Sequence, residues 1–497
     1  MSVRMPEPEA DILSRRDEIV RALRAIVPGE GVIANEREMK PYESDGLTAY
    51  RQLPMVVVLP ETTEQVSSVL RFCYEQGIRV VPRGAGTSLS GGALPLADGV
   101  LLGLGKFNRI LEIDFDNRIV VAQPGVTNLG VSRAVEHAGF YYAPDPSSQI
   151  ACTIGGNVAE NSGGVHCLKY GMTTNNLLGI EFVLMTGEVL HIGGKHLDSE
   201  GYDLLGLITG SEGLLGVVTA VTVRILKKPE TVRAVLIGFE KSEDAGDCVA
   251  QIIGAGIIPG GMEMMDGPAI KAAEEFVHAG YPLDVEALLI VELDGPRAEV
   301  DHLLERVTAI AQSCRAKTLR VSNSEEERLA FWAGRKAAFP AVGRISPDYY
   351  CMDGTIPRGE LPLVLARMRE MSAKYGLQVA NVFHAGDGNL HPLILYDANK
   401  PGELDRAEAF GADILRLCVD VGGVLTGEHG VGVEKRDLMP TMFNEIDLQQ
   451  QQRLKCAFDD KGLLNPGKVF PTLHRCAELG RMHVHAGQVP FPDIPRF

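Results

Sequence analysis

Residues 55–86 read MVVVLPETTEQVSSVLRFCYEQGIRVVPRGAG and hold two hydrophobic runs on either side of a longer amphipathic segment. The valine run at 55–59 predicts one strand, and the run at 78–81 predicts a second. Between them, a capping box that begins at Thr62 opens a segment whose apolar residues recur at helical spacing. The stretch therefore predicts a β-α-β unit that ends in a loop of small residues.

This loop matches neither of the common nucleotide-binding motifs. Leu89 stands where G-x-G-x-x-G requires its last glycine, and Gly92-Ala93 follows where a P-loop requires Lys-Ser/Thr. Even so, Arg83, three small residues and two hydroxyls come directly after a strand, and backbone N–H groups in such a loop can hold a diphosphate. A plain glycine-rich turn is the alternative.

A second irregular stretch, residues 141–171, is rich in Gly, Pro, Ser and Asn. A compact domain seldom carries this much irregular chain unless it lines a ligand. Gly155 and Gly156 would allow a flat ring or a phosphate to approach the backbone, and Asn157 and Asn161 could bond its polar edges. Two such loops suit a long, two-ended ligand such as FAD, whereas a buried glycine-rich crossover remains the alternative.

The segment HAGDGNLH, residues 384–391, lies between two apolar runs and predicts a hairpin whose ends carry His384 and His391. In GEHG, residues 427–430, Glu428 can supply a carboxylate and His429 a base. Two imidazoles, one carboxylate and an open position form a typical catalytic metal site, so His384, His391 and Glu428 are predicted ligands of zinc, manganese or iron(II). A metal-dependent hydrolase and a non-catalytic scaffold both stay open on this pattern.

The bulk properties exclude several classes of protein. The 497 residues predict two or three domains, and the net charge of −17 argues against binding to nucleic acid or to anionic lipid. No apolar run is long enough for a transmembrane helix, and the N-terminus lacks the apolar core of a secretory signal. Nine scattered cysteines without a CxxC pair indicate reduced thiols, a cytoplasmic protein and no iron–sulfur ligand set.

Residues 233 to about 323 predict an antiparallel sheet with helices on one face, because strands and helices alternate there. The strands are expected at 233–239, 261–265, 286–293 and 317–321, and the helices at 242–254, 267–279 and 297–313. The expected division of the chain is a helical lead-in at 1–49, a first domain at 50–228, a second domain at 229–470 and a tail at 471–497.

Five long segments carry a family resemblance. They are PRGAGTSLSGGALPLADGVLL (82–102), YYAPDPSSQIACTIGGNVAENSGGVHCLKYG (141–171), FWAGRKAAFPAVGRISPDYYCMDGTIPRGEL (331–361), NVFHAGDGNLHPLILYDAN (381–399) and GLLNPGK (462–468). They resemble the FAD-linked oxidase superfamily that includes vanillyl-alcohol oxidase, and more narrowly the flavoprotein subunits of bacterial glycolate oxidases.

The resemblance implies an α+β fold, with a two-lobed FAD-binding domain of the vanillyl-alcohol oxidase type and a C-terminal ferredoxin-like cap. Some relatives attach FAD through a histidine after the first glycine loop. Because Thr87 stands there, non-covalent FAD is expected. The implied FAD-binding residues are Arg83, Gly84, Ala85, Gly86, Thr87, Ser88, Gly91, Pro144, Ser148, Gly155, Gly156, Asn161, Gly163, Gly164, Val217, Val218 and Asn465.

The implied reaction is the oxidation of a short 2-hydroxy acid, glycolate to glyoxylate, with hydride transfer to flavin N5; D-lactate is the alternative substrate. Relatives that act on D-2-hydroxy acids bind a divalent metal at the positions of His384, His391 and Glu428. His429 matches their base, and Arg335 matches an arginine that binds the substrate carboxylate. A lysine of some relatives aligns near Cys351, a departure that points to a smaller pocket.

The resemblance also implies partners, because this chain has no cluster ligands of its own. A second flavoprotein-like subunit and an iron–sulfur subunit would carry electrons toward membrane quinone. The expected location is the cytoplasm, with the partners holding the chain at the inner face of the membrane. The tail, 471–497, is a candidate docking segment, and a tail packed on its own domain is the alternative.

Overall fold

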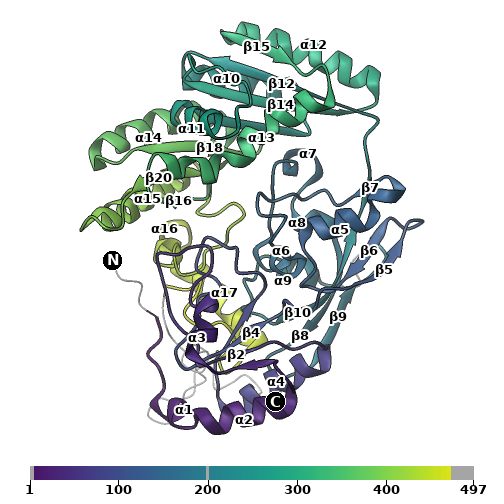
Figure 1. Ribbon diagram of the computed structural model, residues 1–497, viewed down its shortest axis with the longest axis vertical. Coiled ribbons are helices and arrows are strands. Elements are labelled where there is room, and N and C mark those ends of the chain that lie inside the picture. The colour runs from purple at the N-terminus through teal and green to yellow at the C-terminus, as the bar shows by residue number, and fades with distance from the viewer. Residues whose placement is uncertain (1–4, 198–200, 472–497) are drawn as a thin grey trace, which may run out of the picture.

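Two halves lie one above the other in the computed structural model, which describes residues 5–197 and 201–471 (Figure 1). The N-terminal half contains two β-sheet lobes, and the cap formed by the middle of the chain lies across them. The predicted docking tail falls outside the described residues from 472 onward.

The first lobe contains the β-α-β unit predicted from residues 55–86. Its strands β2 (Val56–Val58) and β3 (Val80–Arg83) are parallel but do not touch, since β4 (Val100–Gly103) pairs with both of them. The connecting helix begins where Thr62 Oγ1 accepts a hydrogen bond from the Gln65 N–H, and it ends at Gly77 with a positive φ of 71°. The sheet order is β1 (Val32–Ile33), β2 (Val56–Val58), β4 (Val100–Gly103), β3 (Val80–Arg83), with α2 (Arg16–Ile26) and α4 (Thr63–Gln76) packed on it.

The second lobe is an antiparallel sheet of five strands. Helices α5 (Asn128–Val135) and α6 (Ile154–Glu160) share its hydrophobic core, so the loops around α6 are held against the sheet. The order is β5 (Ile110–Asp114), β6 (Ile119–Ala122), β10 (Val217–Arg224), β8 (Leu177–Val183), β9 (Val189–Gly193).

The cap is built on a seven-stranded sheet in which each neighbouring pair is antiparallel. Its first four strands, with α10 (Ser242–Gly254) and α12 (Arg297–Ser313), follow the ferredoxin-like order, which confirms the predicted cap fold. The order is β15 (Thr318–Val321), β12 (Thr231–Phe239), β14 (Ala287–Gly295), β13 (Gly261–Asp266), β18 (Val379–Phe383), β20 (Pro392–Tyr396), β16 (Asp348–Cys351).

The prediction that helices cover only one face of this sheet was wrong. Along β12, Val235 and Ile237 belong to one core, whereas Ala234 and Leu236 belong to the other. Both faces are therefore apolar, and each is covered. One side carries α10 (Ser242–Gly254), α12 (Arg297–Ser313), α14 (Leu361–Tyr375) and α15 (Glu403–Asp420), and the other carries α11 (Gly267–Val277) and α13 (Glu325–Ala341).

After the cap, the chain returns to the first half through α17 (Glu445–Phe458). Leu464 forms a parallel bridge with Val80, and Lys455 Nζ donates to the Leu214 carbonyl at 2.6 Å. The last described segment thus joins the sheet that begins the fold. The domain boundaries near 50, 228 and 470 stay predictions.

Two further expectations can be compared with the described residues. Seven cysteines are free thiols, as expected, but Cys456 is the exception because it takes part in a disulfide. Within residues 5–197 and 201–471, none of the helices combines the length and apolar character that crossing a bilayer requires.

Candidate functional site

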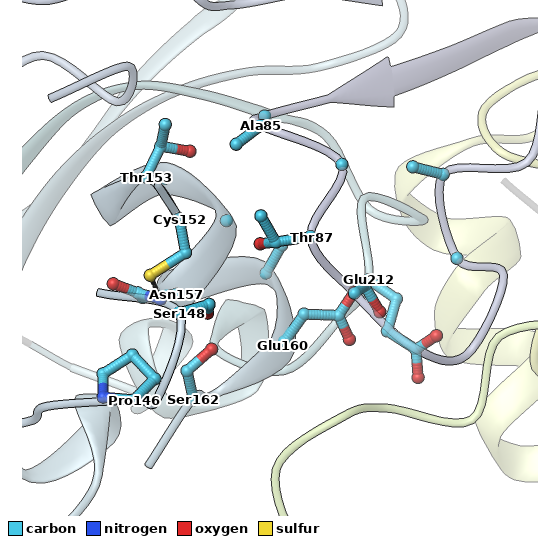
Figure 2. A pocket seen from close by; sticks show the side chains of 18 of the residues that line it. Ala85, Thr87, Pro146, Ser148, Cys152, Thr153, Asn157, Glu160, Ser162 and Glu212 are labelled. Atoms are coloured by element: carbon cyan, nitrogen blue, oxygen red, sulfur yellow. Dashed lines mark hydrogen bonds between the residues drawn. The ribbon is translucent and has the colours of Figure 1, made fainter. Parts of the chain in front are cut away.

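A cavity of about 370 Å³ lies where the two halves meet (Figure 2). Part of its wall is formed by the glycine loop at 83–89 and by residues 146–148, 152–153, 155–157, 159–160 and Ser162. Another part is formed by Lys336, Phe339 and Pro340 of α13 and by His391, Glu428 and His429. The two glycine-rich segments therefore share one space with three of the four residues predicted as ion ligands and base.

The part of the wall formed by the glycine loop fits a ligand that needs close contact with backbone. A Cβ on Gly84 would lie 2.6 Å from Thr153 Oγ1, and one on Gly86 would lie 2.2 Å from the Arg83 guanidinium. Thr153 Oγ1 and Glu160 Oε2 are buried without hydrogen-bond partners in the structure, although both residues line the cavity. Open backbone and unpaired polar atoms suit the phosphates and ring edges of FAD.

Most of the residues predicted to bind FAD line this cavity, namely Arg83, Gly84, Ala85, Gly86, Thr87, Ser88, Ser148, Gly155, Gly156, Val217 and Val218. Gly163 and Gly164 line a second cavity of about 330 Å³, which also reaches His384 and Glu428. Gly91, Pro144, Asn161 and Asn465 line neither of these two cavities. Asn465 instead donates from its amide to the carbonyls of Gly92 and Glu212, behind the cavity wall.

Sequence reasoning missed two acidic residues in the wall. Glu160 and Glu212 lie together beside Gly92 (Figure 2). The Glu212 carboxylate accepts the Val431 and Gly432 N–H groups, each at 2.7 Å, and so ties the loop after His429 to the first half. Burial raises the pKa of both carboxyls above the ordinary value. No short motif marks either residue, because their partners come from distant parts of the chain.

The predicted metal ligands converge. His391 Nε2 lies 3.1 Å from Glu428 Oε1, and His384 Nε2 lies 3.4 Å from the same oxygen. One ligand atom from each of the three residues lies within 4.8 Å of the other two. His384 Nε2 has no hydrogen-bond partner, although the residue is buried. The donor set and the unpartnered nitrogen fit a divalent ion.

Behind this cluster lies a buried carboxylate that the sequence did not reveal. Glu263 Oε1 lies 2.7 Å from His384 Nδ1, and Glu263 Oε2 pairs with Arg335 Nε at 2.7 Å and Nη2 at 2.6 Å. Glu263 and Arg335 are each only 1% exposed. Arg335 lines neither cavity, because its guanidinium is turned toward Glu263.

His429 is held as a neutral imidazole beside the cluster. Its ring stacks on His391 with the centroids 4.9 Å apart. Burial, opposed by the nearby Asp353 carboxylate, lowers the pKa of His429 to about 4. A neutral imidazole next to the ion site can accept a proton, as predicted for the base.

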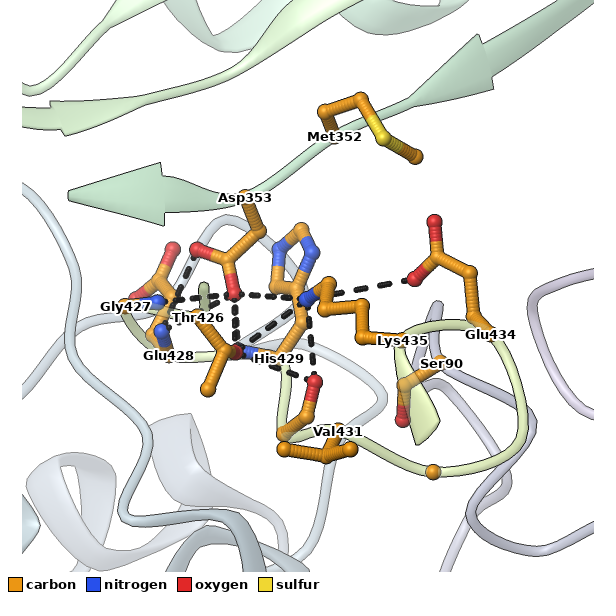
Figure 3. A network of polar contacts seen from close by, with 12 residues as sticks. Ser90, Met352, Asp353, Thr426, Gly427, Glu428, His429, Val431, Glu434 and Lys435 are labelled. Carbon is orange, nitrogen blue, oxygen red and sulfur yellow. Dashed lines mark hydrogen bonds and ion pairs between the residues drawn. The ribbon is translucent and has the colours of Figure 1, made fainter. Parts of the chain in front are cut away.

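Asp353 anchors the loop that carries Glu428 and His429 (Figure 3). Its buried carboxylate accepts the backbone N–H groups of Gly427, Glu428 and His429 and the Lys435 ammonium at 3.2 Å. Burial alone would raise the pKa of Asp353, but the nearby Lys435 ammonium outweighs it and the pKa falls below its ordinary value. The loop therefore has a fixed shape before any ligand enters.

A separate polar contact joins the first half to the cap. His166 lies between Asp145 Oδ2 at 2.8 Å and Glu292 Oε1 at 3.1 Å, and Arg328 Nη1 pairs with Glu292 Oε2 at 2.7 Å. Burial alone would raise the pKa of Glu292, but His166 and Arg328 outweigh it and lower the pKa to about 2. This contact holds the irregular stretch 161–171 against β14.

Comparison with known families matches both halves of the chain. Residues 54–193 match the FAD binding domain, and residues 228–469 match the C-terminal domain of FAD linked oxidases. The glycolate oxidase subunit GlcD of Escherichia coli strain K12 is 58% identical over 97% of both chains. GlcD of Bacillus subtilis strain 168 is 39% identical over 86% of this chain and 92% of its own. A D-lactate dehydrogenase of Anaerostipes hadrus is 30% identical over 91% of this chain and 97% of its own.

Solved structures share the fold. A p-cresol methylhydroxylase with substrate bound superposes with a TM-score of 0.78 at 17% identity, over 93% of this chain and 97% of its own. A 4-ethylphenol oxidase from Gulosibacter chungangensis, in complex with isoeugenol, has a TM-score of 0.77 at 20% identity, over 94% and 98%. At such low identities these neighbours confirm the architecture alone.

Proposed function

The chain belongs to the FAD-linked oxidase family, and from this premise we propose that it oxidises a short 2-hydroxy acid, in the first place glycolate to glyoxylate. One observation carries the proposal: the glycine loops line the same cavity as His391, Glu428 and His429. A hydroxy acid in this space would lie between a flavin and an ion site.

When bound, non-covalent FAD would supply the hydride acceptor, and a divalent ion would supply a Lewis acid for the hydroxyl oxygen. Residues 83–88, 155–156 and 217–218 would hold FAD, and His384, His391 and Glu428 would hold zinc, manganese or iron. His429 accepts the hydroxyl proton as the α-carbon gives up its hydride, because it is neutral and lines the cavity. The product is the 2-oxo acid.

Two cations are candidates for the substrate carboxylate. Arg335 was predicted by resemblance, but in this structure it is paired with Glu263 and lines neither cavity. Lys336, the next residue on α13, lines the main cavity near Phe339. Of the two, Lys336 is the better placed for a direct charge-assisted contact.

The uncharged side chain of Cys351 supports the proposal that the substrate is small. One atom each of Cys351, His391 and His429 lie within 4.8 Å of one another. Burial raises the pKa of the Cys351 thiol well above its ordinary value, so the group is uncharged. An uncharged thiol offers no partner to a second carboxylate, which favours glycolate or D-lactate over a dicarboxylic acid.

The partners and the location are also proposals. GlcD is named as a subunit, which supports a complex of several chains. We propose a second flavoprotein-like subunit and an iron–sulfur subunit as electron acceptors. The location would be the cytoplasm, with peripheral contact to the membrane through these partners.

Anaerobic mixing of the yellow protein with substrate tests the reaction. Glycolate should bleach the flavin absorbance in a single turnover, and comparison with D-lactate at equal concentration ranks the two acids. Faster bleaching by D-lactate would favour the D-lactate dehydrogenase alternative, which the similarity to the Anaerostipes hadrus enzyme supports. A colourless, metal-loaded protein that hydrolyses esters would instead support the metal hydrolase.

A further inference from the structure

Glu263 connects two groups that the sequence analysis placed in separate roles. It lies on β13, the strand that pairs with β18, and His384 follows the end of β18 directly. The ladder pairs Met264 with Phe383, so Glu263 and His384 are brought together by strand register. Their side chains meet at 2.7 Å between Oε1 and Nδ1.

Each oxygen of Glu263 has a separate partner. Oε1 accepts from His384 Nδ1, and Oε2 accepts from the Arg335 guanidinium. All three side chains are at most 3% exposed. A buried carboxylate without a counter-charge would be strongly unfavourable, and Arg335 provides that charge.

This arrangement selects one tautomer of His384. Because Nδ1 donates its proton to Glu263, the lone pair is left on Nε2, the nitrogen that points to Glu428. The other imidazole of the cluster has no such support, since His391 Nδ1 finds no hydrogen-bond partner among the described residues. His384 is therefore the ligand whose orientation is set in advance.

We propose that Glu263 is a positioning residue of the ion site, that it holds His384 ready to bind a divalent ion, and that Arg335 acts through Glu263 rather than on the substrate. The inference rests on the ion site of the proposed function and goes beyond it. Arg335 thereby compensates the charge of Glu263, which in turn orients the His384 ring.

Equilibrium dialysis of the full-length flavoprotein against Zn²⁺, with elemental analysis, tests the first part. Glu263→Gln should weaken Zn²⁺ binding about 10- to 100-fold, the usual effect of removing a carboxylate behind a metal-binding histidine. Glu263→Asp, which keeps the charge at a shorter reach, should fall between it and the unmodified protein. The FAD content should not change, because Glu263 does not line the flavin cavity.

Asp244→Asn is the matched control. Asp244 is a buried carboxylate on α10 that pairs with Arg315 in the turn after α12, so its replacement removes a buried ion pair of the cap without changing a contact of His384. It should bind Zn²⁺ as the unmodified protein does. An equal loss of affinity in this control, or unchanged affinity in Glu263→Gln, would overturn the inference. An unmodified protein that binds none of Zn²⁺, Mn²⁺ and Fe²⁺ would overturn the proposed ion site together with it.

Arg335→Gln separates the two possible roles of the arginine. If Arg335 acts through Glu263, the variant loses Zn²⁺ affinity, and glycolate oxidation recovers when excess Zn²⁺ is added. If Arg335 instead binds the substrate carboxylate, Zn²⁺ affinity is unchanged, and the KM for glycolate rises and stays high in excess Zn²⁺. The second result would reject the part assigned to Arg335.

Discussion

At the scale of single residues, the site depends on how burial changes ordinary chemistry. His429 is neutral because desolvation lowers its pKa to about 4. Cys351 is an uncharged thiol because burial raises its pKa. Asp353, in contrast, stays ionised in the interior because it accepts three backbone N–H groups and faces Lys435. The same burial therefore leaves one imidazole neutral, one thiol uncharged and one carboxylate ionised.

Replacing His429 by Gln should slow flavin reduction by glycolate about 100-fold or more, because the hydroxyl proton loses its acceptor. Stopped-flow absorbance under anaerobic conditions measures this rate. The FAD content should remain normal, and Zn²⁺ content should remain normal too, since His429 is not one of the proposed ligands. An unchanged single-turnover rate would reject His429 as the base.

Gly86→Ala should lower FAD affinity about tenfold or more, equivalent to about 1.4 kcal/mol. The new Cβ would lie 2.2 Å from the Arg83 guanidinium at the cavity wall. Gly77→Ala is the control, because Gly77 has the same φ of 71° but no heavy atom within 4 Å of the added Cβ. Both variants lose folding stability of about 1 kcal/mol. Fluorescence titration with FAD should distinguish them, and equal FAD affinity in both would contradict a flavin site at this loop.

At the scale of elements, short irregular segments carry the site while strands and helices hold them in place. The 161–171 stretch contains few buried apolar side chains, so its position depends on polar contacts with the cap. His166 and Lys169 make these contacts with Glu292 and Asp294, both on β14. A single strand of the cap thus fixes a loop of the first half.

The Glu292 contact predicts a stability loss in acid. The folded-state pKa of Glu292, about 2, lies below its ordinary value of 4.5, so the carboxylate stabilises the fold above pH 4.5. That contribution is lost as the pH falls from 4.5 toward 2. Glu292→Gln should therefore cost about 3 kcal/mol at pH 7 and progressively less below pH 4.5.

Thermal unfolding of the unmodified protein and of Glu292→Gln at a series of pH values measures how their difference in stability decreases in acid. His166, whose pKa lies well above its ordinary value, stays protonated across the same range and does not cancel the effect. If the difference in melting temperature stays constant down to pH 3, the charge of Glu292 does not contribute to the stability of the fold.

At the scale of the whole molecule, the site exists only where the two halves meet and where the chain returns to its start. Asn465 bonds the cavity wall through Gly92 and Glu212, and Leu463 and Leu464 are buried in the first lobe. The C-terminal part of the chain therefore supports the wall of the cavity from behind.

Truncation tests this arrangement. A chain that ends after residue 444 should fail to retain FAD, because it loses α17 and the segment that pairs with β3. A chain that ends after residue 471 should keep FAD and bleach with glycolate, since the lining residues are all present. The flavin absorbance of each purified chain measures its FAD content. Normal FAD content in the chain that ends after residue 444 would show that residues 445–471 are not needed to hold the cavity wall. If the chain that ends after residue 471 still co-purifies with partner subunits, the prediction that the tail is a docking segment would be contradicted.

Local sequence patterns determined much of this protein. The valine runs, the capping box at Thr62 and the alternation after residue 230 predicted the elements, and the family resemblance predicted the α+β fold, the FAD-linked oxidase family and the oxidoreductase class, all of which are confirmed. The hairpin composition of residues 384–391 predicted that two histidines would converge, because a turn and its flanking strands are short-range features. The assignment of individual residues to FAD, ion and substrate stays a prediction.

Only the tertiary structure decided the rest. Glu263 reaches His384 across 121 positions, Glu212 reaches Gly432 across 220, and Arg335 is turned away from the cavity toward Glu263. A lone glutamate in a strand looks the same in sequence whether it faces solvent, a cation or a metal ligand. Its role depends on long-range strand register and on charge balance in a buried space, and neither leaves a pattern along the chain.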